Sequence, residues 1–416
     1  MIKFTLLFLL ICINGFAQTG GQLPAWQEGF LDIHYINTGR GDACFMVLPD
    51  GTTLQVDAGD MSDTDPRTTS RRNAERAPNA SKTAPGWIAD YIDQFRPQAL
   101  PRQLDYALIT HYHDDHFGVA DSLRQIAAGG YQLFGIPELG TLIPIKTLID
   151  RGFSFPIDLK SEEVQSNPRM PADWLETLKE YWKFIDYQQN KGMQHEELQV
   201  GSRQQIVLKN KPQQFPGFSV HNIASNGRFY TGYADDDFHS IFIEGEYPGE
   251  NPLSNGIRID YGKFNYFTGG DIAGIDGIGQ ADFSSVEAQV APVIGPVDVA
   301  TLNHHGNRDS QSPYYVRTIR PRVWIQQNWT ADHPGEEVFR RISSTELYPG
   351  ERDIFSTILL QGTKDVIGGS LDRYKSQQGH IVVRVHPGGD QYEIFVLNDK
   401  TEKREITSHF GPYVSR

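Results

Sequence analysis

The sequence predicts an α+β protein in which two β-sheets are packed between layers of helices, a four-layer αββα arrangement. Short apolar segments bounded by turn residues occur in both halves of the 416-residue chain, and amphipathic segments with helical spacing lie between them. The chain contains 40 Gly and 24 Pro, which favour many turns and short strands over long helices. An apolar content of 38% is typical of a packed globular protein.

The N-terminal segment, residues 1–17, has the pattern of a secretory signal peptide. A lysine precedes an apolar run over residues 4–13, and residues 15–17 have the small-x-small pattern of a cleavage site. The apolar run is shorter than the roughly 20 residues that cross a bilayer, so we expect cleavage after Ala17 and no membrane anchor. The expected location is therefore the periplasm or the extracellular space. Cleavage would leave Cys44 as the only cysteine, which excludes an internal disulfide.

The predicted domain spans residues 28–416, and its first half starts as a meander of strands. We expect strands over residues 30–36, 44–48, 53–56 and 106–110, separated by Gly-rich and Pro-containing turns. The apolar residues from Trp87 to Phe95 have helical spacing and predict an amphipathic helix. A second helix is predicted over residues 118–128, because the pair Gly129 and Gly130 would end it.

Residues 140–215 are predicted to form an inserted helical segment. Trp174, Leu178 and Trp182 have helical spacing and lie between polar segments. The second half then returns to strands. We expect strands over residues 256–261, 264–268, 297–302 and 323–326, a helix over 313–320, and a closing hairpin of 381–385 with 392–396.

A cluster of metal-ligand side chains directly follows the predicted strand 106–110. His111, His113, Asp115 and His116 lie within six residues, and imidazole nitrogens and carboxylate oxygens are good ligands for Zn²⁺ and similar ions. In an extended loop His111 and His113 point to the same side, and a turn brings Asp115 and His116 in from another side. The segment could therefore supply two ligands to each of two metals.

Other acidic and imidazole side chains follow further apolar strands. Asp57 comes after strand 53–56, Asp271 comes after strand 264–268, and the pair His304 and His305 follows strand 297–302. Glycines beside these residues permit close approach of the backbone. Each position alone would be an ordinary turn residue, but together with the His cluster they indicate a composite metal site.

The order of these residues, Asp57, then His111-x-His113-x-Asp115-His116, then Asp271, then His304-His305, resembles the metallo-β-lactamase superfamily. That family has an αββα sandwich with one or two metals at the sheet edges. Two branches are similar in pattern. Residues 37–43, the segment 304–306 and residues 332–334 resemble the hydrolase domain of competence-type DNA-uptake proteins, while the helical segment resembles the secreted phosphorylcholine esterases. Both branches act on phosphodiesters.

The resemblance implies a role for each matching residue. His111 and His113 would bind the first metal, Asp115 and His116 the second, and Asp271 would bridge the two. His304 is preferred over His305 as the last ligand of the second metal. Asp57 would orient a ligand from outside the ligand set. The implied catalytic residues are Asp115, which would orient the activated water, and His305 and His333, which would donate a proton to the leaving group or contact its oxyanion.

One family ligand has no counterpart in this sequence. Many members have a further His between the His cluster and the bridging Asp, where this chain has Ser254, Asn255 and Gly256. The branches that act on phosphodiesters lack this His too, which favours a phosphodiesterase-type activity. The first metal would then be held only by His111, His113 and Asp271. The ligand types suit two Zn²⁺ ions, with Mn²⁺ or Fe²⁺ as alternatives.

The net charge of −14 gives no overall attraction for nucleic acid, so stable nucleic-acid binding is not expected. A small anionic or phosphodiester substrate fits the composition better, and the polar loop containing Arg67, Arg71, Arg72 and Arg76 could contact it. Two alternatives stay open. One is a hydrolase of a lactone, carboxyl ester or β-lactam on the same scaffold, and the other is a metal-binding homologue without catalytic activity.

Overall fold

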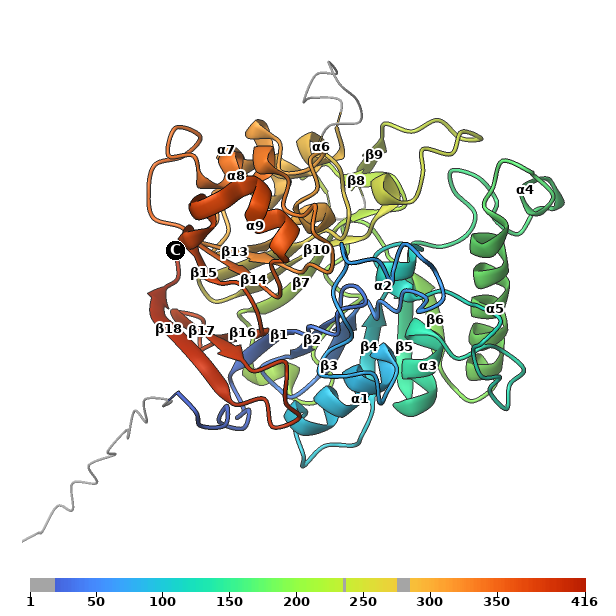
Figure 1. The fold of residues 1–416 in the computed structure, drawn as a ribbon, viewed down its shortest axis with the longest axis horizontal. Coiled ribbons are helices and arrows are strands. Elements are labelled where there is room, and N and C mark those ends of the chain that lie inside the picture. Colours follow the sequence, from blue (N-terminus) through green and yellow to red (C-terminus); the bar gives the residue numbers. More distant parts are fainter. Residues whose placement is uncertain (1–18, 235–236, 275–284) are drawn as a thin grey trace, which may run out of the picture.

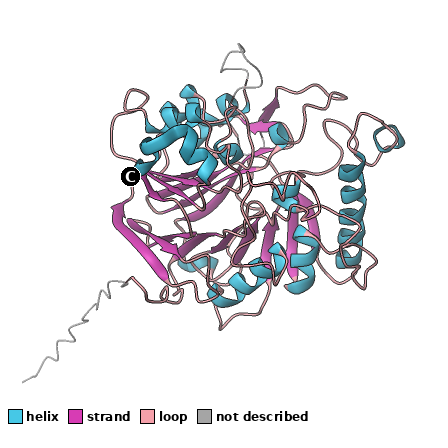
Figure 2. Ribbon diagram, viewed as in Figure 1, coloured by secondary structure: helices cyan, strands magenta, loops and turns pink. Residues whose placement is uncertain are grey.

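The computed structural model describes residues 19–234, 237–274 and 285–416. The predicted signal peptide, residues 1–17, lies outside these ranges. The described chain has two nine-stranded sheets stacked face to face, and helices cover the outer face of each sheet (Figures 1 and 2). This α+β arrangement is the four-layer sandwich that the sequence predicts.

The first sheet is antiparallel from β18 to β3 and parallel from β3 to β6. Its strands, in spatial order, are β18 (Ile406–Val414), β17 (Gln391–Leu397), β16 (His380–Val385), β1 (Leu31–Tyr35), β2 (Cys44–Val47), β3 (Thr53–Val56), β4 (Leu104–Leu108), β5 (Ile145–Asp150) and β6 (Gln194–Glu197). The closing hairpin of the sequence therefore pairs with the first strand through β16.

The second sheet is parallel from β15 to β11 and antiparallel from β11 to β9. Its strands, in spatial order, are β15 (Tyr374–Ser376), β14 (Asp353–Ser356), β13 (Val323–Gln326), β12 (Val299–Thr301), β11 (Phe264–Thr268), β10 (Gly256–Tyr261), β7 (Phe218–Ser225), β8 (Arg228–Tyr230) and β9 (Phe238–Ser240). The predicted strands 53–56, 256–261, 264–268 and 323–326 are confirmed with the same bounds.

The helices are divided between the two outer faces. Apolar residues of α1, α3 and α5 pack on the first sheet, and those of α6, α7 and α8 pack on the second (Figure 1). The α-helices are α1 (Ala84–Phe95), α2 (Asp114–Phe117), α3 (Gly135–Leu142), α4 (Glu162–Gln165), α5 (Ala172–Gln189), α6 (Val286–Ile294), α7 (Pro313–Ile319), α8 (Glu336–Ser343) and α9 (Gln361–Ile367), and the 3₁₀ helices are η1 (Pro212–Gln214), η2 (Asn251–Leu253), η4 (Asn303–Gly306) and η5 (Gly368–Arg373).

A continuous apolar core fills the space between the sheets. Strands contribute alternate side chains to it, for example Ile33 from β1 and Ile259 from β10, both fully buried. The opposite side chains of the same strands enter the two helix layers. None of the helices in the described ranges has the length and apolar composition to cross a membrane.

Two segments between β4 and β7 differ from the structure that the sequence predicts. The helix predicted over residues 118–128 is wrong, because this stretch is turns and loop in the structure. The helix α2 ends at Gly118, whose φ of 94° suits glycine, and Arg124 binds the buried Asp60 carboxylate 2.5 Å away. Residues 140–215 contain the long helix α5 but also β5 and β6, which extend the first sheet.

One buried ion pair joins the first strand to the closing hairpin. The Arg384 guanidinium donates to both oxygens of Asp32, at 2.8 and 2.6 Å, and both side chains are buried. Burial alone would raise the pKa of Asp32, but Arg384 outweighs this effect and lowers the pKa to about 2. The Asp32 carboxylate is therefore charged throughout the physiological range.

Replacing Asp32→Ala is expected to lower the free energy of unfolding by about 3–5 kcal/mol, because the Arg384 charge stays buried without its partner. Denaturant unfolding at neutral pH measures this. The control is Glu336→Ala, which breaks the exposed pair with Arg340 on α8 and should cost less than about 1 kcal/mol. Because the folded-state pKa of Asp32 is depressed, its contribution is present above about pH 4 and fades as the pH falls toward 2.

Candidate metal centre

The site lies where the parallel strands of both sheets end. Asp57 follows β3, and His111 comes three residues after the end of β4 in the first sheet. Asp271 follows β11, and His304 lies in η4 after β12, in the second sheet. Because the carboxyl ends of these strands meet at one edge of the sandwich, residues far apart in the sequence converge there.

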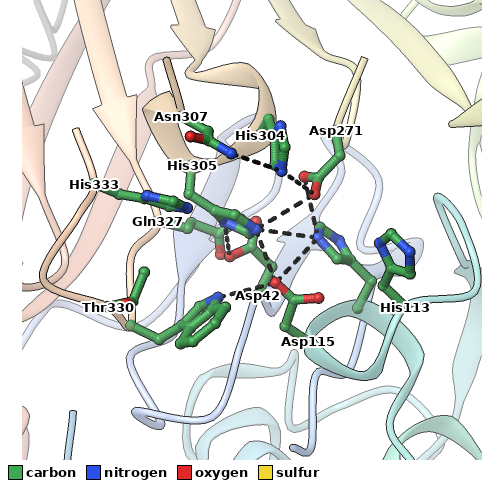
Figure 3. Close-up of polar contacts among 12 residues, drawn as sticks. Asp42, His113, Asp115, Asp271, His304, His305, Asn307, Gln327, Thr330 and His333 are labelled. Carbon is green, nitrogen blue, oxygen red and sulfur yellow. Dashed lines mark hydrogen bonds and ion pairs between the residues drawn. The ribbon is translucent and has the colours of Figure 1, made fainter. Parts of the chain in front are cut away.

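Four side chains form a buried group with metal-ligand chemistry, namely Asp115, His116, Asp271 and His305. Figure 3 shows Asp115, Asp271 and His305 converging from different segments of the chain. The Nε2 atom of His116 lies 3.3 Å from Nε2 of His305 and 3.1 Å from Oδ1 of Asp271. The Nε2 atom of His305 lies 3.0 Å from Oδ2 of Asp115 and 3.5 Å from Oδ2 of Asp271. Ligand atoms about 2.1 Å from a tetrahedral Zn²⁺ ion would stand about 3.4 Å apart, so the spacing fits one ion.

The second imidazole nitrogens of these histidines have partners of their own. The Nδ1 atom of His116 contacts Oδ2 of Asp57 at 2.9 Å, and Nδ1 of His305 lies 3.1 Å from Oδ1 of Asp42. A proton on each Nδ1 satisfies these carboxylates and leaves the two Nε2 lone pairs facing one another. Two lone pairs and two carboxylates that converge in a buried place repel each other unless a cation lies between them.

A second group contains His111, His113 and, once more, Asp271. The Nε2 atom of His111 lies 3.0 Å from Nδ1 of His113 and 3.7 Å from Oδ2 of Asp271. Asp271 is thus shared by both groups, as the sequence resemblance implies for a bridging ligand. The second group contains three residues and the first contains four. The resemblance implies a fourth ligand at this place, the further His that this sequence lacks.

The adjacent residues His304 and His305 have different surroundings. The Nδ1 atom of His304 faces Asp309 at 2.8 Å, while its Nε2 atom lies 3.1 Å from the Asn251 amide and 3.3 Å from the Asn307 amide. These amides donate to the Nε2 lone pair of His304, which lies 3.7 Å from Asp271. His305, and not His304, therefore belongs to the group of four ligand atoms, whereas the sequence resemblance implies His304 as the last ligand.

The backbone explains how two neighbouring histidines diverge. His304 and His305 both have left-handed conformations, with φ of 49° and 54°. Residues other than glycine rarely adopt this region, and each such residue costs on the order of 1–3 kcal/mol. The Glu287 carboxylate on α6 holds the chain on both sides of this pair. It accepts hydrogen bonds from the Asn303 side-chain amide at 2.8 Å and from the backbone N–H groups of Gln311 and Ser312 at 2.6 and 2.7 Å. Strain of this kind is concentrated at functional sites.

His333, which the sequence resemblance gives a catalytic role, lies outside both groups of ligand atoms. Its ring stacks on His305, with centroids 5.7 Å apart and an interplanar angle of 13°. Burial lowers the pKa of His333, and the neighbouring His305 adds to this effect, so that the pKa is about 4. The imidazole is therefore neutral at physiological pH.

Burial and charge set the protonation of the ligand atoms. Burial opposes a charge on His116, but the Asp271 and Asp115 carboxylates outweigh it and raise the pKa of His116 well above its ordinary value. Burial lowers the pKa of His111 well below its ordinary value. Burial would raise the pKa of Asp271, but the surrounding histidines hold it well below its usual range. The cluster therefore attracts positive charge, either as protons or as a metal cation.

Several residues of the site were not assigned a role from the sequence. Trp329 donates from Nε1 to Oδ2 of Asp115 at 3.0 Å, and Thr110 donates to both oxygens of Asp57. Asp42 contacts His305, and Gln327 donates to Asp42 at 3.0 Å. Asp42 stands out in the sequence as an acidic residue in the Gly-rich turn 37–43, but this position does not indicate that it contacts His305.

A cleft of about 460 Å³ opens beside the ligand groups. Trp329, His333 and Asp114 connect it to the site, because each is a neighbour or contact of a ligand residue. The cleft is lined by Met61, Asp65, Arg67, Thr68, Ser70, Arg72, Asn73, Asp114, Trp329, Thr330, Asp332 and His333. Of the four arginines in the loop 67–76, Arg67 and Arg72 belong to this lining, while Arg76 pairs with Asp63.

The comparison with known families agrees with this architecture. Residues 85–129, which include all of α1 but its first residue, β4 and the whole segment 111–116, match the sequence model of the metallo-beta-lactamase superfamily. No curated protein matches the chain significantly. The matched segment and the two-sheet sandwich are similar to the metallo-beta-lactamase superfamily, and the His/Asp groups have the residue types and spacing that could hold a divalent metal.

Proposed function

We propose that this protein is a metal-dependent hydrolase that binds two divalent ions and cleaves a phosphodiester. The convergence of the His116 and His305 Nε2 atoms with the Asp115 and Asp271 carboxylates is the observation that carries the proposal. Nitrogen and carboxylate ligands in near-tetrahedral spacing fit Zn²⁺, with Mn²⁺ and Fe²⁺ as alternatives. Residues 1–17 support export, which N-terminal sequencing of protein recovered outside the cytoplasm would test.

The two ligand groups support one assignment of residues to the two proposed ions. His111, His113 and Asp271 would hold the first ion, and Asp115, His116 and His305 would hold the second together with Asp271. The proposal takes His305 as the last ligand of the second ion, where the sequence-based expectation takes His304. Bound divalent ions would act as Lewis acids and lower the pKa of water toward neutrality, which supplies a nucleophile for hydrolysis.

The chain itself contributes orientation and hydrogen bonds. Trp329 holds the Asp115 carboxylate from the cleft side, so Asp115 keeps one direction when substrate enters. His333 lies on the cleft wall against His305 and is neutral, so its ring N–H can donate a hydrogen bond to a leaving-group oxygen. Exclusion of water from the buried ligand groups strengthens these interactions.

The cleft supports a polar substrate of limited size. Its volume is within the range of small-molecule sites, and the Arg67 and Arg72 guanidinium groups give it two cationic side chains. A lactone, carboxyl-ester or β-lactam substrate is the second candidate. It is favoured by the Asp65, Asp114 and Asp332 carboxylates of the same lining, which disfavour an anion.

One set of measurements tests the proposal and separates these candidates. The metal content of purified protein is determined first, and hydrolysis of a chromogenic phosphodiester, a lactone and a β-lactam is then compared at equal metal loading. We expect about two ions per chain and turnover of the phosphodiester. Turnover of the carbon substrates alone would contradict phosphodiester chemistry, and protein that binds no Zn²⁺ or Mn²⁺ and hydrolyses nothing would contradict the enzyme assignment.

The combined substitution of Arg67→Ala and Arg72→Ala is expected to raise KM for an anionic phosphodiester by about three- to tenfold with little change in kcat. The reason is that these exposed guanidinium groups bind substrate without acting at the reacting atoms, and exposed pairs contribute about 1 kcal/mol. Steady-state kinetics measures the effect. Arg71→Ala is the control, since Arg71 is outside the cleft lining; equal KM values for all variants would remove these arginines from substrate binding.

A further inference from the structure

The Asp42 carboxylate lies between His305 and Gln327 (Figure 3). One oxygen, Oδ1, lies 3.1 Å from Nδ1 of His305, and the other, Oδ2, accepts a hydrogen bond of 3.0 Å from the Gln327 side-chain amide. All three side chains are buried. Within the described part of the chain, neither Oδ1 of Asp42 nor Nδ1 of His305 has a hydrogen-bond partner, and the ion-pair contact between them is the 3.1 Å approach of these two atoms. Each is therefore the group available to satisfy the other.

The direction of the Gln327 amide is fixed by the backbone. Its Oε1 atom accepts a hydrogen bond of 3.2 Å from the N–H of Ala43, which can only donate. The NH₂ group of Gln327 must then face Asp42, as observed. The backbone of Asp42 is held as well, because its N–H donates to the Asp115 carbonyl at 2.8 Å and its carbonyl accepts from Gly59 at 2.9 Å.

The same turn is pressed closely against the ligand segment. A Cβ atom on Gly41 would come within 2.2 Å of the Asp115 carbonyl oxygen, and the φ of 124° at Gly41 suits glycine alone. Asp42 is thus fixed on three sides, by the segment that contains Asp115, by Gly59, and by Gln327. A carboxylate held in this way can define the state of the histidine that it contacts.

We propose that Asp42 is a positioning residue that fixes the proton of His305 on Nδ1, and that Gln327 fixes the direction of Asp42. The Nε2 lone pair of His305 is thereby turned toward Asp115, His116 and Asp271, where it can bind an ion. This inference rests on the proposed function, since it takes His305 as a metal ligand. The inference gives a role to the carboxylate of Asp42, in the turn before β2, which is distant in the sequence from His305.

The substitution Asp42→Asn tests the direction of these hydrogen bonds while keeping the size of the side chain. Because Gln327 presents its NH₂ group, the introduced amide must turn its oxygen to Gln327 and its own NH₂ group to Nδ1 of His305. Nδ1 then becomes an acceptor and the proton moves to Nε2, which faces the ligand group. We expect the affinity for Zn²⁺ at the second ion position to fall by about 10- to 100-fold.

The double substitution Asp42→Asn with Gln327→Glu supplies the matched control. The introduced carboxylate accepts from Ala43 and from the introduced amide, which then turns its oxygen back to His305. The net charge of the pair equals that of the wild type. We expect this double variant to recover most of the lost Zn²⁺ affinity, although each substitution alone weakens binding, so that the double-mutant cycle gives a large favourable coupling.

Zn²⁺ affinity is measured by competition with a chromogenic chelator, and long-range ¹⁵N–¹H NMR of histidine-labelled, zinc-loaded protein reports which nitrogen of His305 carries the proton. The His305 signal is identified by its loss in His305→Gln. We expect zinc on Nε2 and the proton on Nδ1 in the wild type; the reverse would overturn the inference even if a variant folded poorly. Equal affinity of Asp42→Asn and wild type, or no recovery in the double variant, would also overturn it. A wild type that binds no zinc would contradict the proposed function instead.

Discussion

Replacing Asp271→Ala is expected to remove most of the bound metal and to lower kcat/KM by about a thousandfold or more. Asp271 is the residue shared by both ligand groups, with its Oδ1 atom 3.1 Å from His116 and its Oδ2 atom 3.5 Å from His305 and 3.7 Å from His111. Loss of the shared carboxylate takes one ligand from each ion and also removes negative charge that draws cations into the site. Metal catalysis supplies several kcal/mol of barrier lowering, and about 4 kcal/mol corresponds to a thousandfold in rate.

Elemental analysis of the purified variant and steady-state kinetics with the phosphodiester measure this effect. The matched control is Asp186→Ala, which removes an exposed carboxylate from α5 and should leave metal content and kinetics at wild-type values. A variant that keeps two ions per chain and full activity would contradict the bridging role.

The sequence was sufficient to predict the bounds of strands that are flanked by clear turn residues. The strand over residues 53–56 is preceded by the turn of Pro49, Asp50 and Gly51, and its bounds were predicted without error. The helix predicted over residues 118–128 was wrong. The apolar residues Leu123 and Ile126 are exposed, and Arg124 forms a salt bridge with Asp60, which is distant in the sequence. Local periodicity does not contain such contacts.

The same distinction applies to the site. His111, His113, Asp115 and His116 are close in the sequence, so their common location could be inferred from spacing alone. The contribution of Asp42 could not, because it depends on the turn before β2 lying against the Asp115 carbonyl and on Gln327 arriving from β13 in the other sheet. Contacts between the two sheets are a property of the tertiary fold and leave no local pattern in the sequence.

The choice between His304 and His305 depends on the backbone and not on residue type. Neighbouring residues of one type have equal chemistry, and only the backbone decides which side chain enters the ligand group. In η4 both residues adopt left-handed conformations, which turn His304 toward Asp309 and Asn251 and His305 toward Asp115 and Asp271. Two successive left-handed residues other than glycine are unusual enough that no sequence rule anticipates them.

Replacing His305→Ala is therefore expected to lower the metal content from about two ions per chain to about one, and to lower kcat/KM by about a hundredfold or more. The second ion would lose one of its two imidazole ligands, and the Asp42 carboxylate would be left buried without its partner. Replacing His304→Ala should keep both ions, since the His304 Nε2 atom is engaged by the Asn251 and Asn307 amides.

The pair of variants is decisive because the two residues are adjacent and differ only in what they contact. Metal analysis and isothermal titration with Zn²⁺ on both variants give the stoichiometry, and His304→Gln serves as a second control that keeps a polar side chain beside Asp309. Loss of an ion in His304→Ala with retention in His305→Ala would reverse the assignment and return the ligand position to His304. Loss in both would mean that the two imidazoles act together, with His304 reaching Asp271 over its present 3.7 Å when the ion is bound.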